Sequence, residues 1–143
     1  MLQQMASFIA TVDAAVAALD DPGERLVEGF VTILRAARTH PLLSRLLETG
    51  PDAILPFLTT EGGAVLTLCR DHLAEHLRGF QQAGTMPPEL DPEVVAEVIV
   101  RLAQSLLITP HGVIDADDEA GLRRLGRAYV VPLLAGRAAS PVS

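Results

Sequence analysis

The chain has 143 residues, a length that suits one domain with one sizeable hydrophobic core. Hydrophobic residues make up 49% of it but aromatic residues only 3%, so the core must consist of Leu, Val, Ile and Ala, a composition typical of packed helices. The net charge is -7 and the basic residues are scattered arginines, which argues against a phosphate-binding stripe.

The sequence carries no signal for export or membrane insertion. Its single cysteine, Cys69, cannot form an internal disulfide, and its first residues lack the basic region of a signal peptide. Charged residues interrupt every apolar run before it could span a bilayer, and Glu97 and Arg101 interrupt the richest one. We therefore expect a cytoplasmic protein without a membrane segment.

Two helices are predicted at the start of the chain. The first covers about residues 3–19, where apolar side chains recur at steps of three and four. The stretch DDPGE ends it and starts the second, because Asp20 or Asp21 can cap a helix and proline suits a first helical turn. The second helix runs to about Thr39, since the proline after His40 pushes that histidine out of the helical region.

The middle of the chain predicts a short helix, a bend and a long helix. The short helix is PLLSRLLETG, closed by Gly50. Pro56 and the glycine pair after it leave PDAILPFLTTEGG irregular or as a broken helix beside the core. A long helix then continues to about Ala83, followed by GTMPPELDP as a surface loop.

Two long apolar helices are predicted in the last third of the chain. Asp91 and Pro92 mark the start of the first, which is apolar over more than half its circumference and must be covered on two sides. The second covers about residues 117–135, begins in the acidic stretch DADDE, and should kink or end near Pro132. Its apolar face is expected to contain Leu122, Leu125, Tyr129 and Leu133, flanked by the small residues Gly121 and Ala128.

The large apolar surface of these two predicted helices indicates that the chain self-associates. A helix too apolar for one partner favours a contact of four helices, two from each subunit of a two-fold homodimer. The domain is expected to span residues 1–136, with residues 137–143 as a flexible tail. The expected dimer interface contains Val95, Ile99, Leu102, Leu106, Leu122, Leu125 and Tyr129.

The stretch CRDHLAEHL has the H-x-x-E-H spacing of a zinc peptidase helix. His72 and His76 lie one turn apart, and Glu75 could act as the base for a metal-bound water. A third ligand is not singled out, although Cys69 lies one turn earlier. On a helical wheel His76 lies at the border of the buried face and Glu75 points toward solvent. We therefore favour histidines at the margin of a core helix or pocket, and we predict no catalytic residue, no metal and no cofactor.

The order of these helices resembles the C-terminal ligand-binding and dimerisation domain of TetR-family transcriptional regulators. The most telling stretches are THPLLSRLL, DPEVVAEVIVRLAQSLL with its trailing TP, and the last helix with Pro132. The resemblance covers nearly the whole chain. It implies an all-α multi-helix bundle, a dimer formed through the last two helices, and a small-molecule pocket among the earlier helices.

The resemblance also implies regulation of DNA binding by an effector. In such regulators the effector moves the first helix and with it N-terminal helix-turn-helix heads, which this sequence lacks. We expect the chain not to bind DNA by itself, whether it is incomplete, has a misassigned start or naturally lacks the heads. The effector is unknown and is expected to be modestly hydrophobic. The inward-facing candidates for its contacts are Phe8, Phe30, Phe57, Leu66, Cys69, Leu73 and His76.

Two other functions stay open at this point. A stand-alone helical interaction module would need no DNA-binding heads at all. A zinc-dependent hydrolase would use the HLAEH helix and bind stoichiometric zinc through His76.

Overall fold

The computed structural model describes residues 2–135, which are mostly helical and contain no β-strand in that range. The predicted all-α fold is therefore confirmed. The predicted flexible tail, residues 137–143, lies outside the described residues. The helices are α1 (Leu2–Val16), α2 (Pro22–Thr39), α3 (Pro41–Thr49), α4 (Pro51–Leu58), α5 (Gly63–Gln82), α6 (Pro92–Ile108) and α7 (Glu119–Leu125), continued by a π-helical turn (Gly126–Val130) and a 3-10 turn (Val131–Ala135).

Helix starts follow the predicted capping signals. The carboxylate of Asp21 accepts a hydrogen bond from the backbone N–H of Glu24 at 2.9 Å, and a proline follows it at the first helical position. Asp91 caps α6 in the same way, and Asp118 caps α7. Such a cap contributes about 0.5–2 kcal/mol to helix stability. The acidic stretch before α7 thus acts as a helix start.

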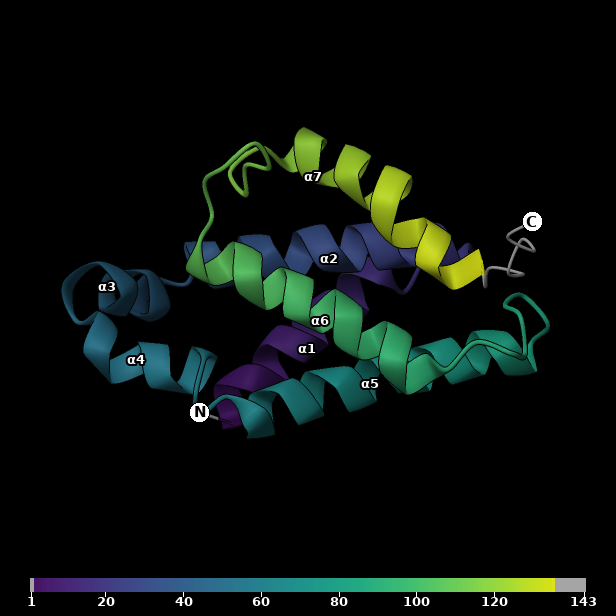
Figure 1. Cartoon of the computed structure of the whole chain (residues 1–143), viewed down its shortest axis with the longest axis horizontal. Helices are drawn as coiled ribbons and strands as arrows, with labels where there is room; N and C mark the ends of the chain where they lie inside the picture. Colours follow the sequence, from purple (N-terminus) through teal and green to yellow (C-terminus); the bar gives the residue numbers. More distant parts are fainter. Residues whose placement is uncertain (1, 136–143) are drawn as a thin grey trace, which may run out of the picture.

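The helices form two packed pairs that face each other. α1 packs mainly on α2, α5 packs mainly on α6, and α2 also contacts α6 (Figure 1). α3 and α4 lie together at one end of these pairs, and α7 lies along α2. No helix in residues 2–135 is long and apolar enough to cross a membrane. The core shared by these elements contains Leu26, Phe30, Val31, Leu34, Ala74, Leu77, Ala96, Ile99, Leu106, Leu122, Val130 and Leu134.

Ion pairs join α2 to the segment around α7, which runs antiparallel to it. The Arg123 guanidinium donates two hydrogen bonds to the Glu28 carboxylate, at 2.8 and 3.3 Å, and these hydrogen bonds hold the pKa of Glu28 below its ordinary value. The pairs are Glu24 with Arg127, Glu28 with Arg123, Arg35 with Glu119, and Arg38 with Asp117.

The last helix departs from the predicted regular α-helix. Pro132 has no N–H to donate to the carbonyl four residues earlier, and the backbone before it widens into a π-helical turn. This changes which side chains face inward: Val130 and Leu134 are buried, whereas Tyr129 is 74% exposed and Leu133 is 38% exposed. The four residues of the predicted apolar face therefore do not share one environment, since Leu122 is buried and Tyr129 and Leu133 are exposed.

The small residues of this helix also differ from the prediction. A Cβ atom on Gly121 would meet the capping carboxylate of Asp118 rather than another helix, and Ala128 is exposed. The close approach is made by Gly126, where a Cβ atom would lie 3.2 Å from the Cγ2 of Val27 on α2. Gly126, and not Gly121, thus lets the last helical segment pack closely against α2.

Two smaller predictions are corrected. α1 ends at Val16 instead of about residue 19, because the Arg25 side chain binds the carbonyls of Ala17 and Leu19 and the chain turns there. The loop between α5 and α6 is not wholly on the surface, since Met86 is 5% exposed.

Candidate ligand-binding cavity

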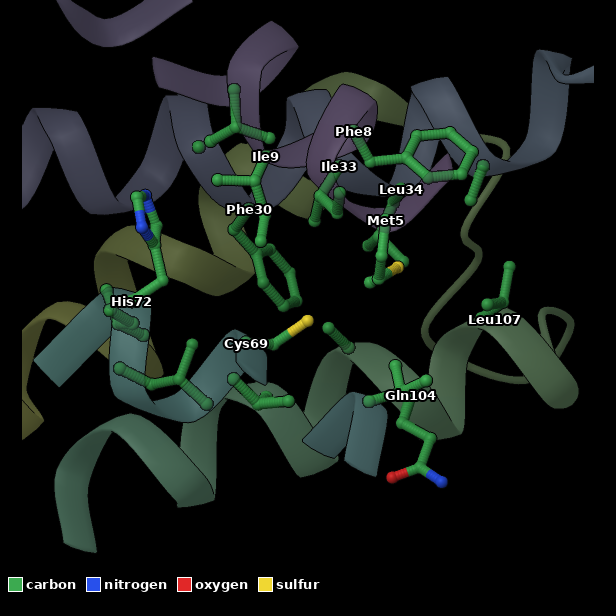
Figure 2. A pocket seen from close by; sticks show the side chains of 18 of the residues that line it. Met5, Phe8, Ile9, Phe30, Ile33, Leu34, Cys69, His72, Gln104 and Leu107 are labelled. Atoms are coloured by element: carbon green, nitrogen blue, oxygen red, sulfur yellow. The ribbon is translucent and has the colours of Figure 1, made fainter. Parts of the chain in front are cut away.

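A cavity of about 280 Å³ lies between the α1–α2 pair and the α5–α6 pair. Its volume is close to the lower end of the ~300–1,000 Å³ that is typical of ligand pockets. Figure 2 shows side chains from α1, α2, α5 and α6 around it, and α3 and α4 add apolar side chains at one end. Its apolar wall includes Met5, Phe8, Ile9, Val12, Phe30, Ile33, Leu34, Leu46, Phe57, Leu66, Leu73, Leu77, Phe80 and Leu107.

Polar side chains on the wall are used to hold the helices. His40 accepts a hydrogen bond from the backbone N–H of Leu43 at 3.2 Å, which starts α3, and its ring centroid lies 5.5 Å from that of Phe8. The guanidinium of Arg25 lies 5.8 Å from the ring centroid of Phe80. The Gln104 amide donates a hydrogen bond to the backbone carbonyl of Leu58 and so joins α6 to the end of α4. The interior therefore offers mainly apolar contacts.

The structure places all seven predicted ligand contacts on the cavity wall. Phe30 is deeply buried, whereas Phe57 is 42% exposed. Leu66, Cys69, Leu73 and His76 line the wall from α5. Their role in binding stays a prediction, since a position on the wall does not itself identify a ligand contact.

Sequence reasoning missed Asp13 as a wall residue. Asp13 lies on α1, where the predicted apolar face drew attention to its neighbours. Its carboxylate Oδ1 lies 2.9 Å from His72 Nε2 and 3.3 Å from His76 Nε2. A signal was present, because Asp13 carries the one charged side chain in the α1 sequence LQQMASFIATVDAAV.

The residues of the H-x-x-E-H motif lie on different sides of α5. His72 and His76 are half-buried and their ring centroids are 4.9 Å apart, whereas the Glu75 side chain is 76% exposed and pairs with Arg78. Glu75 therefore points away from the two imidazoles, in agreement with the helical wheel, and is not placed to act as a base for a metal held between them.

Cys69 offers a direct test of the cavity environment. Its Sγ projects toward the cavity in Figure 2, and burial raises the pKa of the thiol to about 11. At pH 8 only about one thiol in a thousand would be ionised, so we expect Ellman's reagent to react far more slowly with the folded chain than with the chain in urea. Because Cys69 is the single cysteine, the absorbance change reports this thiol alone. Equal labelling rates in the two states would contradict a buried thiol.

The predicted dimer residues have three different environments. Ile99, Leu106 and Leu122 are at most 6% exposed and belong to the hydrophobic core of the single chain, so they offer little surface to a partner. Their place at a dimer interface stays a prediction. Val95, Leu102 and Leu125 are half-buried, and Tyr129 is exposed.

The described residues thus form an all-α domain with a partly open apolar cavity between its helices. The sequence profile described as "Bacterial Tetracyclin repressor, C-terminal domain" matches residues 21–125. The chain therefore belongs to the TetR C-terminal domain family, whose members are regulatory domains for ligand binding and dimerisation rather than typical enzymes. Neither the curated proteins nor the solved structures contain a significant match.

Proposed function

We propose that this domain binds a small, largely apolar effector in the cavity and acts as the sensing and dimerisation part of a cytoplasmic transcriptional regulator. The observation that carries the proposal is the partly open apolar cavity between α1, α2, α5 and α6. Apolar walls favour an apolar ligand because binding removes both surfaces from water. Membership of the TetR C-terminal domain family supports the same function.

The position of α1 supports an allosteric mechanism. Met5, Phe8 and Ile9 form one wall of the cavity, so a bound effector touches α1 directly (Figure 2). An effector that binds more tightly to one position of α1 shifts the population toward that position. In this proposal the shift passes through α1 to DNA-binding heads outside these 143 residues.

The proposed dimer uses the outer surfaces of α6 and the last helical segment. Val94 and Val98 on α6 are 59% and 48% exposed, and Tyr129 and Leu133 are exposed on the last segment. In Figure 1 α6 lies at the front of the molecule, and none of the other helices within residues 2–135 passes in front of it. A second copy of the chain could cover these apolar side chains symmetrically.

Filling the cavity tests the sensing function. The fluorescent probe N-phenyl-1-naphthylamine is small and apolar, and we expect it to bind the wild-type chain with increased fluorescence. Because Cys69 projects toward the cavity, Cys69→Phe should occupy the space and weaken probe binding by at least about tenfold. The measurement is a fluorescence titration, with circular dichroism to confirm helical content.

Val113→Phe provides the matched control. Val113 is fully exposed in the loop after α6, so the same aromatic side chain there should leave probe affinity unchanged. If both variants bound the probe like the wild type, the cavity would not be the binding site.

A further inference from the structure

Asp13, His72 and His76 bring three potential metal ligands to one point between α1 and α5. The candidate ligand atoms all lie within 4.8 Å of one another. Asp13 Oδ1 is 2.9 Å from His72 Nε2 and 3.3 Å from His76 Nε2. In a tetrahedral zinc site with bonds of about 2.0–2.1 Å, ligand atoms lie about 3.3 Å apart. The two distances from Asp13 are already close to this spacing, and the two imidazole nitrogens lie within 4.8 Å of each other.

The two histidines are held in the orientation that such a site requires. They are four residues apart on α5, so both imidazoles project from the same side of the helix. Each presents Nε2 to the same carboxylate oxygen, and the rings meet edge to face. Two candidate ligands thus come from α5, and the third, Asp13, comes from α1, 59 positions before His72 in the chain.

We propose that Asp13, His72 and His76 bind one divalent transition-metal ion of the Zn²⁺ class. Two imidazoles and one carboxylate suit Zn²⁺, Co²⁺ or Ni²⁺, whereas Mg²⁺ and Ca²⁺ prefer oxygen ligands alone. The three side chains are 33–42% exposed, so an ion can reach them and water can complete its coordination.

Other candidate ligands are less suited to this ion. Cys69 lies one turn before His72, but burial disfavours its thiolate, the form that binds metal. Glu75 is turned outward and paired with Arg78. A second group, His111 with Asp115 and Asp117, is fully on the surface and supplies one imidazole instead of two.

A metal ion at this site would join α1 to α5 at the edge of the cavity. Asp13, His72 and His76 all lie on the cavity wall, so the ion would restrict the same helix that an effector touches. This consequence rests on the proposed function, in which movement of α1 carries the signal of effector binding to the DNA-binding heads. Metal binding itself does not depend on that function.

Calorimetric titration of the chelator-treated chain with ZnCl₂ tests the site. We expect one Zn²⁺ per chain, and we expect His76→Ala and Asp13→Ala each to raise the Kd by at least about 10- to 100-fold. His111→Ala is the matched control, because it removes an imidazole from the exposed group and should keep the wild-type Kd. Co²⁺ absorption spectra give a second readout, since loss of a ligand changes the metal's d–d bands.

Circular dichroism on each variant shows whether the chain is still folded, and so separates loss of a ligand from loss of the fold. His72→Gln serves the same purpose as a milder replacement. A wild-type chain that takes up less than one Zn²⁺, or a folded His76→Ala chain that keeps the wild-type Kd, would overturn the site. Probe binding by N-phenyl-1-naphthylamine is measured on the same metal-free chains. Failure of the cavity proposal is therefore distinguishable from failure of the metal site.

Discussion

Replacing Leu122 by alanine should lower the free energy of unfolding by about 2–5 kcal/mol, the range for truncation of a fully buried leucine. Leu122 is 1% exposed and belongs to the core cluster. It is also the one buried residue of α7, a helix of seven residues, so no second side chain of α7 can replace its contacts. Urea unfolding followed by circular dichroism measures the loss.

Leu42→Ala is the matched control, because it makes the same chemical change at a side chain that is 49% exposed. Its effect should stay below about 1 kcal/mol, as expected for a surface position. All chains are compared at one concentration, since the proposed dimerisation would contribute to apparent stability. A Leu122→Ala chain as stable as Leu42→Ala would contradict the packing of α7 described above.

Placing a charge on the outer surface of α6 should separate the proposed dimer. Val98→Glu introduces a carboxylate that a partner would bury, and two-fold symmetry places one in each subunit. An uncompensated buried charge costs about 3–5 kcal/mol, which corresponds to a dissociation constant raised by about two to four powers of ten. Sedimentation velocity at micromolar concentration should show a dimer for the wild type and a monomer for Val98→Glu.

Val113→Glu makes the same substitution in the loop between α6 and α7, at a fully exposed position, and should remain dimeric. A monomeric wild-type chain would rule out the dimer proposal. A dimeric Val98→Glu chain would instead place the interface on another surface.

Local signals in the sequence explain why most helix boundaries were predictable. Asp21 and Asp91 cap their helices through bonds within three residues, and the prolines next to them act on the adjacent backbone. The missing N–H of Pro132 predicted a kink or an end of the last helix at this place. It did not predict that the backbone before the proline would take the form of a π-helical turn.

In the candidate sites, too, features that depend on one helix were predictable, whereas features that depend on contacts between helices were not. Helical periodicity placed Leu73 and His76 on the inner side of α5, because periodicity is a property of one helix. The pairing of Asp13 with the two histidines was missed because it depends on how α1 lies against α5. The predicted dimer residues raise a related difficulty. An apolar side chain such as Ile99 can face its own core or a partner, and periodicity does not distinguish the two.

Charge along α2 also specifies the direction of the last helical segment. Glutamates near the start of α2 pair with Arg123 and Arg127, and arginines near its end pair with Asp117 and Glu119. A segment lying the other way round would set acid against acid and arginine against arginine. Each exposed pair contributes only about 0–1 kcal/mol, but the reversed arrangement replaces every attraction by a repulsion. The charges therefore favour the native arrangement over its reverse.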